Sequence, residues 1–449
     1  MHITAQTFCI PTIENGASMR MAIDLLMTDN PTDAIPLIAR RIGKLAFITI
    51  PEKFGLHSFT FRKMGIKSSK QKSSKKVVVI GGSYAGTAAV TLLDPHFEVT
   101  WIERRPCLIH KMNVRAAVQH EWIDSALIPS DKVLSRGTRI QGDVTSVDLG
   151  LKSVSVNTTD GSKNVSYDYL IIATGSRSFS PLDPKFDKLG NSTIDSLKKH
   201  FDSVSKSIAG APNIVVLGGG PVGCEMAGEI KAKYPTHNVT IISKSKILCD
   251  QMGTGGTGSE KIKFAMEKCG IRVVLDTSVT VPSSIRSETF IDPSKVSLPN
   301  DLAADLIINC TGTEPNTHFM SSQFLSKSKH IKVNEFLQVD GRPVFAIGDC
   351  NDVAEPKLFV TCGTRKFMFT FPTGHADIVF KNIVAMENGK TLVPYKPQEG
   401  KPKILLPLGP KTAVAINAPQ FFAKMKAKDY FYPAQFKFSK NKTVPKLPL

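Results

Sequence analysis

Two parts of the sequence repeat the same local pattern. An apolar segment, Val77–Ile80, runs into the glycine-rich turn Gly81–Gly86, and Asn213–Leu217 runs in the same way into Gly218–Gly223, starting 137 residues after the first turn. Each turn is followed by a helical stretch and then by another apolar segment. This order is that of a βαβ unit. The chain is therefore predicted to contain two α/β domains, each with a parallel sheet.

The second turn carries a complete G-x-G-x-x-G pattern. Gly218 permits a tight turn, Gly220 lets a pyrophosphate approach the backbone, and Gly223 lets the helix pack closely on the strand. The helix N-terminus behind the turn favours phosphate groups. Because the pattern lies between a strand and a helix, we interpret it as a dinucleotide-binding site.

The first turn differs at one position. Gly81, Gly82 and Gly86 are present, but Ser83 replaces the middle glycine and is expected to crowd a pyrophosphate slightly. Glu103 follows 22 residues after Gly81, at the end of the next predicted strand, where an acid suits a ribose diol. A solvated glutamate at a strand end is the alternative. We favour a second dinucleotide site.

The second unit has no acid at the corresponding strand end. Ser243, Lys244 and Lys246 stand there instead. A carboxylate would repel a 2′-phosphate, whereas a hydroxyl beside ammonium groups accepts one. These residues favour NADPH as well as NADH, unless they simply form a polar loop in a lysine-rich protein.

The charge of the chain is strongly positive, at +18. Residues 67–76 contain five lysines and no acid, and residues 396–449 contain eleven lysines. Such runs favour anionic partners, namely phospholipid, nucleic acid or phosphorylated ligands, although a solvated basic surface is the alternative. The sequence has no run of about 18 apolar residues, so we expect a soluble protein or one that lies on a membrane surface.

The eight cysteines are widely spaced, and the closest two are twelve residues apart. This spacing includes no CxxC pair and no zinc-like quartet, so we expect no metal site. A reducing intracellular compartment fits best.

A set of motifs in fixed order carries a family resemblance: GGSYAG, Glu103, IIATGS, GGGPVGCEMAGEI, CTGTEPN and FAIGDC. From about Met64 onward the chain resembles the FAD-dependent pyridine nucleotide oxidoreductases, and within them the apoptosis-inducing-factor-like group that includes ferroptosis suppressor protein. The resemblance implies an α/β fold of two interleaved Rossmann-type domains, for FAD and NAD(P), of the disulfide-reductase-like flavoprotein fold, plus a small α+β C-terminal domain. It also implies hydride transfer from NAD(P)H to FAD and onward to a quinone.

The implied domain boundaries follow the motifs. Residues 1–63 are an extension of uncertain status. We assign the rest as follows: residues 64–187 and 326–390 to the two parts of the FAD domain, 188–325 to the NAD(P) domain, and 391–449 to the C-terminal domain.

The resemblance also implies site residues. Those matching FAD contacts of the family are Gly81, Gly82, Gly86, Glu103, Arg115, Thr174, Gly175 and Asp349. Ser83, Gly312 and Gly348, which lie in the same motifs, are further cofactor-binding candidates. On the nicotinamide side the matches are Gly218, Gly220, Gly223 and Glu225, with Ser243 and Lys244 added from the strand end. Glu225 resembles a family glutamate near the nicotinamide–flavin contact, although it could merely compensate the helix dipole. Lys426 matches a family lysine that could protonate a reduced quinone.

The cysteine pair of the related disulfide reductases is missing. Cys107 has no partner at the expected spacing, and Cys224 replaces an ordinary small residue. Without a relay, electrons must pass from flavin directly to a small acceptor, and a quinone fits this need.

One connection departs from the family pattern. Residues 359–373 make it roughly ten residues longer before the helix start that resembles Gly374–Asp377. Either these residues form a longer loop, or they are sequence, such as a translated intron, that is absent from the functional protein.

Met64–Ser69 reads M-G-x-x-x-S, an acceptor motif for N-myristoylation at Gly65 if translation starts at Met64. The adjacent lysines would add a second membrane signal. We therefore expect a cytoplasmic protein held peripherally on an anionic membrane or a lipid droplet, with a mitochondrial location less favoured.

Two other functions stay open. A death effector of the apoptosis-inducing-factor type would bind DNA non-specifically through its lysines, but we find no nucleic-acid module. A reductase of a small electron-transfer protein, such as ferredoxin or rubredoxin, is the other alternative.

Overall fold

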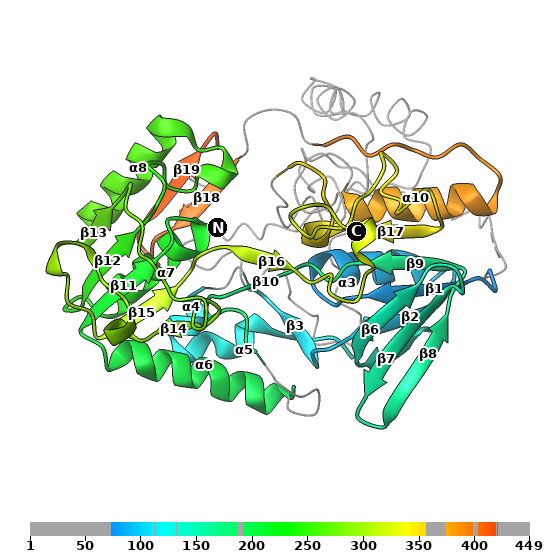
Figure 1. Cartoon of the computed structure of the whole chain (residues 1–449), viewed down its shortest axis with the longest axis horizontal. Helices are drawn as coiled ribbons and strands as arrows, with labels where there is room; N and C mark the ends of the chain where they lie inside the picture. The colour runs from blue at the N-terminus through cyan, green and yellow to red at the C-terminus, as the bar shows by residue number, and fades with distance from the viewer. Residues whose placement is uncertain are drawn as a thin grey trace, which may run out of the picture. The chain divides into compact units, whose positions relative to one another are not determined.

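A computed structural model of the chain describes residues 73–111, 114–131, 133–185, 192–355, 374–397, 403–418 and 420. Two five-stranded sheets organise them, and Figure 1 shows each sheet with its helices. The fold is therefore mixed α/β with two parallel sheets, as predicted.

The first sheet has five parallel strands in the order β17-β9-β1-β2-β5. Their bounds are β17 (Val344–Ala346), β9 (Tyr169–Ile172), β1 (Lys76–Ile80), β2 (Glu98–Glu103) and β5 (Thr138–Gln141). Strand β17 comes from a part of the sequence beyond the second glycine-rich turn, yet it completes the sheet begun by β1. The two Rossmann-type units are therefore interleaved along the chain.

Alternate residues of β1 face two different layers, as the pleat of a strand requires. Val77 and Val79 belong to a core shared with helices α3 (Tyr84–Leu93) and α10 (His375–Glu387). Val78 and Ile80 face the other side. That second core includes residues of a three-stranded antiparallel sheet made of β6 (Asp143–Asp148), β7 (Ser153–Thr158) and β8 (Gly161–Ser166).

The second sheet has the order β13-β12-β11-β15-β14, with only β14 antiparallel. The strands are β13 (Ile271–Val274), β12 (Asn238–Ile242), β11 (Asn213–Leu217), β15 (Leu306–Asn309) and β14 (Phe290–Ile291). Its largest core includes α6 (Ile194–Ala209), α7 (Pro221–Lys233), α8 (Gly255–Lys268) and the hairpin of β18 (Ile404–Pro407) and β19 (Ala413–Ile416). The β18–β19 hairpin of the C-terminal region thus packs on the helices of the second sheet, whereas Tyr395 belongs to the core of the first sheet.

Short elements connect the two sheets. The antiparallel pair β10 (Ser176–Ser178) and β16 (Thr313–Pro315) joins the segments that follow β9 and β15. A second antiparallel pair is β3 (Cys107–Ile109) with β4 (Leu127–Pro129), next to the short helices α4 (Arg115–Val118) and α5 (Ile123–Ala126). The 3-10 turns are η2 (His120–Trp122), η4 (Asp250–Met252), η5 (Pro293–Lys295), η6 (Pro299–Asp301), η7 (Ser322–Phe324) and η8 (Gly348–Cys350).

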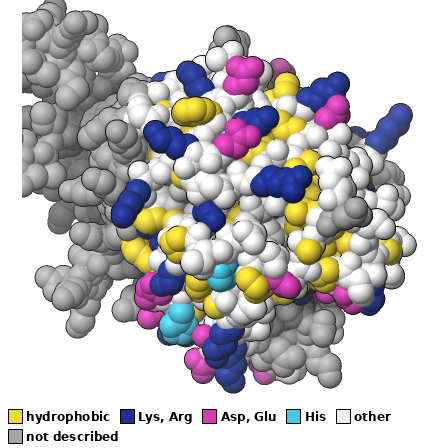
Figure 2. Space-filling model, turned by 90° about the vertical axis from the view of Figure 1, so that its left-hand side faces the viewer, with side chains coloured by type: hydrophobic (Ala, Val, Ile, Leu, Met, Phe, Trp, Pro, Cys, Tyr) yellow, Lys and Arg dark blue, Asp and Glu magenta, His cyan; other side chains and the backbone are white. Residues whose placement is uncertain are grey.

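Charges of both signs mix on the surface drawn in Figure 2, where lysine and arginine side chains lie among aspartates and glutamates. Most of the two lysine-rich runs, and the predicted residues Gly65 and Lys426, lie outside the described residues. None of the described helices has both the length and the apolar composition that crossing a membrane requires.

Candidate functional site

A cavity of about 750 Å³ opens at the carboxyl ends of the first sheet. This edge is where ligands bind in open α/β sheets, and the volume lies within the usual range of cofactor pockets. Five predicted residues line the cavity: Gly81, Gly82, Ser83, Glu103 and Thr174. The structure thus brings together residues from three strand ends that are up to 93 positions apart.

The glycines of the first turn are fixed by close backbone contacts. A Cβ atom on Gly86 would lie 1.9 Å from the Gly81 carbonyl oxygen, so helix α3 can approach β1 only with glycine there. Gly81 itself has φ +106°, a conformation that favours glycine. The turn therefore presents backbone to the cavity, followed by Ser83 as the N-cap of α3.

Glu103 lies across from this turn, as the acid of a ribose site must. A Cβ atom on Gly82 would come within 2.8 Å of a Glu103 carboxylate oxygen. The other oxygen, Oε1, accepts a hydrogen bond from the Arg105 backbone N–H at 2.8 Å. The side chain is thereby held between the turn and the cavity, and it fits a ribose diol.

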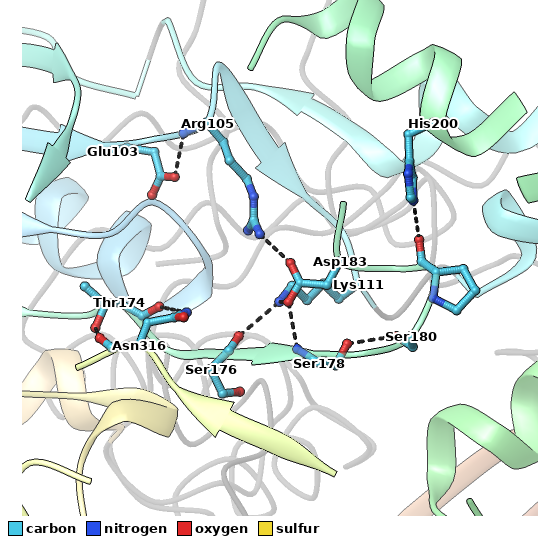
Figure 3. Close-up of polar contacts among 11 residues, drawn as sticks. Glu103, Arg105, Lys111, Thr174, Ser176, Ser178, Ser180, Asp183, His200 and Asn316 are labelled. Carbon is cyan, nitrogen blue, oxygen red and sulfur yellow. Dashed lines mark hydrogen bonds and ion pairs between the residues drawn. The ribbon is translucent and has the colours of Figure 1, made fainter. Parts of the chain in front are cut away.

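A polar cluster beside Glu103 was not predicted from the sequence (Figure 3). Asp183 is 3% exposed and lines the cavity. Its carboxylate accepts from Lys111 Nζ at 2.7 Å and from the Ser178 N–H at 2.9 Å, and it also pairs with Arg105. Burial alone would raise the pKa of Asp183, but Lys111 and Arg105 outweigh it and lower the pKa to about 2.

This cluster connects the cavity with the more distant predicted residues. Lys111 Nζ also donates to the Ser176 carbonyl oxygen at 3.2 Å, and Ser176 Oγ donates to Asp349 Oδ2 at 2.9 Å. Thr174 and Asn316 exchange two hydrogen bonds next to it, of 2.7 and 3.0 Å. The turns after β9 and β17 are therefore linked by side chains as well as by the sheet.

Arg115 lies elsewhere. Its side chain is 2% exposed and binds the Glu229 carboxylate through Nε and Nη2, both at 2.9 Å. It does not line the cavity described above. Burial raises the pKa of Glu229, although Arg115 and Gln119 favour its carboxylate form. The structure thus uses Arg115 to join α4 to α7 and does not bring it to the other residues predicted to contact FAD.

The second glycine-rich turn repeats the geometry of the first. Gly218 has φ +113°, and a Cβ atom on Gly223 would lie 2.0 Å from the Gly218 carbonyl oxygen. Gly220 is the N-cap of α7, and no atom of the described residues lies within 4 Å of a Cβ atom built on it. The helix N-terminus is therefore open to a phosphate group.

Ser243 takes the place that Glu103 has in the first unit. A Cβ atom on Gly219 would lie 2.6 Å from Ser243 Oγ, just as one on Gly82 would meet Glu103. The side chain of Lys244, next to it, is exposed. Lys246 forms an ion pair with Asp276 at 3.5 Å. The remaining predicted residue of this side is Glu225, which is buried in the first half of α7. Gly312, predicted as a further cofactor-binding glycine, has φ +69° in the turn after β15.

The sequence missed one contact between cysteines. Cys224 in α7 and Cys249 lie with their sulfur atoms 4.0 Å apart, and both are buried. The hydrogen bond with Cys249, together with burial, raises the pKa of Cys224 well above its ordinary value. Neither of these two cysteines lines the cavity, whereas Cys107 does.

The match to known proteins agrees with this geometry. The family described as pyridine nucleotide-disulphide oxidoreductase matches residues 75–368. The chain belongs to this family. It is accordingly an FAD-dependent NAD(P)H oxidoreductase, and the cavity at the first turn fits FAD while the second turn fits NAD(P)H.

Curated relatives place the chain more narrowly. It is 32% identical to apoptosis-inducing factor homolog B of Dictyostelium discoideum over 370 residues, which cover 77% of this chain and 90% of the relative. It is 29% identical to human ferroptosis suppressor protein 1 over 354 residues, covering 77% and 89%. The resemblance predicted from the motifs is confirmed.

Solved structures agree on the fold. The sulfide:quinone oxidoreductase of Aquifex aeolicus is 16% identical, with a TM-score of 0.58 over 83% of this chain and 92% of that one. A ferredoxin reductase from Rhodopseudomonas palustris is 19% identical, with a TM-score of 0.52 over 72% and 78%. At this identity the likeness establishes the architecture alone.

Proposed function

We propose that the protein transfers electrons from NAD(P)H to a quinone at a membrane surface, with bound FAD as the redox centre between them. The family resemblance, which implies onward transfer to a quinone, is supported by the similarity to ferroptosis suppressor protein 1. The observation that carries the proposal is the chemistry of the cavity wall. Among the described residues that line the cavity, Cys107 is the one cysteine, so the wall has no dithiol.

Cys107 is unsuited to thiol chemistry by itself. Its side chain is 1% exposed. Burial raises the pKa of the thiol to about 11, although Arg105 acts in the opposite direction. Because the thiolate is the reactive form, the raised pKa keeps Cys107 mainly as the less reactive thiol at neutral pH. An acceptor must therefore take electrons directly from the cofactor.

The protein residues have binding and positioning roles in this proposal. We assign Gly81, Gly82, Ser83, Gly86 and Glu103 to the adenosine and pyrophosphate side of FAD, and Thr174, Gly175, Gly348 and Asp349 to the remainder. Gly312 stays a predicted cofactor-binding glycine. Gly220 brings the backbone to the pyrophosphate of NAD(P)H, Gly218 and Gly223 form the turn and the close helix packing behind it, and Glu225 lies on the nicotinamide side. Lys426 stays a predicted proton donor to the reduced quinone, outside the described residues.

An acceptor screen tests the proposal. FAD-loaded protein is supplied with NADH or NADPH and with a short-chain ubiquinone analogue, ferricyanide, a disulfide or a ferredoxin. We expect the quinone to give the highest kcat/KM, and Cys107→Ser to keep most of that activity. Cys269→Ser, a half-buried cysteine away from the cavity, is the matched control. Faster turnover with the disulfide, or loss of quinone reduction in Cys107→Ser with FAD still bound, would refute the direct route.

The donor preference follows from Ser243 and Lys244. We expect wild-type protein to use NADPH at least as well as NADH. In Ser243→Glu, a carboxylate would take the place that Glu103 has in the first unit and repel a 2′-phosphate. The ratio of kcat/KM for NADPH to that for NADH should then fall by roughly tenfold to a hundredfold.

Two further variants test which lysine binds the 2′-phosphate. Lys244→Gln should lower the use of NADPH and leave NADH unchanged, because NADH has no 2′-phosphate. Lys246→Gln should have a smaller effect, since Lys246 is already paired with Asp276. If the wild-type protein prefers NADH and none of these substitutions changes that preference, the residues at this strand end do not determine the choice between NADPH and NADH.

The membrane part of the proposal rests on residues 64–76. If the chain begins at Met64 in the cell, myristate on Gly65 and the following lysines should bind anionic vesicles, and added salt should weaken that binding. Mass spectrometry of the natural N-terminus and vesicle sedimentation at two salt concentrations check this. An unmodified N-terminus that retains residues 1–63, with no vesicle binding, would remove the membrane from the proposal.

A further inference from the structure

A buried chain of hydrogen bonds lies behind the turn that follows β17. The Gly348 N–H donates to Nδ1 of His375 at 3.0 Å. The other ring nitrogen, Nε2, lies 3.0 Å from Oε1 of Glu355, and the hydroxyl of Tyr395 donates to the same oxygen at 2.6 Å. His375 is 0% exposed, so its ring lies wholly inside the protein.

The direction of these bonds fixes the protonation of His375. A backbone N–H can only donate, so Nδ1 must be the acceptor and carries no proton. The imidazole is then neutral with its proton on Nε2, where Glu355 accepts it. A carboxylate that orients the far nitrogen of a histidine is a recurrent way of selecting one tautomer. Glu355 therefore keeps Nδ1 available to Gly348.

The ring itself is held in place by packing. The Tyr395 ring meets it edge-on, with centroids 4.5 Å apart and planes at 90°. His375 is also the first residue of α10, directly after the N-cap Gly374. Helix α10, the carboxyl end of β17 and the segment after α10 thus meet at one imidazole, and Figure 1 shows α10 beside β17.

The turn held by His375 contains Asp349. Gly348 has φ +73°, and the chain there leaves the sheet at the same edge as Thr174, which lines the cavity. Asp349 Oδ2 accepts from Ser176 Oγ on β10. The direction of the Asp349 side chain depends on the peptide that precedes it, and His375 binds the N–H of Gly348 next to it.

We infer that His375 is a positioning residue for the FAD site: its Nδ1 accepts the Gly348 N–H and so fixes the turn that carries Asp349, with Glu355 selecting the required tautomer. This rests on the assignment of Asp349 to FAD in the proposed function, and not on the identity of the electron acceptor. The sequence assigned His375 only to a helix start.

Two substitutions separate the hydrogen bond from the packing. In His375→Asn, the amide oxygen lies where Nδ1 was and can accept from Gly348. In His375→Gln, the amide reaches toward Glu355 and leaves the buried Gly348 N–H without an acceptor. Apo protein is titrated with FAD, and flavin fluorescence gives the dissociation constant. We expect binding to weaken about tenfold to a hundredfold in His375→Gln and by less than about threefold in His375→Asn.

The visible spectrum of bound FAD is a second readout. It should shift in His375→Gln and stay near that of the wild type in His375→Asn. Equal losses in both variants would mean that His375 acts through packing alone, and wild-type affinity in both would mean that it does not support the site. Either result overturns the inference. Thermal unfolding of each apo protein shows whether the variants fold.

A measurement on the unmodified protein covers the case in which His375→Gln does not fold. Nitrogen-15 spectra of histidine side chains in the FAD-loaded protein should show His375 neutral and protonated at Nε2. A proton on Nδ1 would overturn the inference. None of these measurements uses an electron acceptor, so a failure of the quinone proposal would leave them unaffected.

Discussion

Arg115→Met is expected to lower the free energy of unfolding by about 3–5 kcal/mol, because it leaves the Glu229 carboxylate buried without its partner. Both side chains are at most 3% exposed, and the two 2.9 Å contacts hold α4 against α7. Gln119, the other donor to Glu229, is 3.3 Å away and uncharged. It cannot replace a bidentate guanidinium. Urea denaturation followed by circular dichroism measures the loss.

The same two segments provide controls for this prediction. Lys233, at the end of α7, pairs at 2.9 Å with Glu121, which lies just beyond α4, but this pair is exposed. Glu121→Gln should therefore cost less than about 1 kcal/mol. The double variant Arg115→Met/Glu229→Leu should recover most of the lost stability, since it removes the buried charge. If Arg115→Met costs no more than Glu121→Gln, the buried pair does not stabilise the contact between α4 and α7.

Glu103→Ala is expected to weaken FAD binding by about a hundredfold or more. The carboxylate is held between the Gly82 turn and the Arg105 N–H, where it can accept hydrogen bonds from both hydroxyls of a ribose. Hydrogen bonds to a charged group contribute about 1.5–3 kcal/mol each, so losing two costs roughly 3 kcal/mol or more. Titration of apo protein with FAD, followed by flavin fluorescence, gives the two dissociation constants.

Glu98→Gln is the matched control, because Glu98 is an exposed glutamate at the opposite end of the same strand. It should leave FAD affinity unchanged. Circular dichroism should show that both variants keep the fold. If Glu103→Ala binds FAD as tightly as the wild type does, Glu103 does not bind the ribose of FAD. A wild-type protein that stays colourless with added FAD would contradict the assignment of the whole cavity.

Local patterns in the sequence predicted the elements that form the site. Strand β11 has the predicted bounds, and β2 ends at Glu103 as expected. Helix α7 begins at Pro221, inside the predicted turn Gly218–Gly223, because proline fits the first turn of a helix, where its missing N–H is not needed. These features depend on neighbouring residues, whose apolar spacing and glycine content determine the backbone.

The sequence by itself determined two glycine-rich turns, the acid after the first and the hydroxyl after the second, and so predicted two nucleotide sites. Only the tertiary structure decided which side chains far apart in the chain meet. Arg115 and Glu229 are 114 residues apart, and Arg105 and Asp183 are 78 apart. No local period encodes such pairs. They depend on how the crossovers place strands and helices from separate parts of the chain, so Arg115 in α4 binds Glu229 in α7, Asp183 joins the cavity wall and His375 meets Gly348.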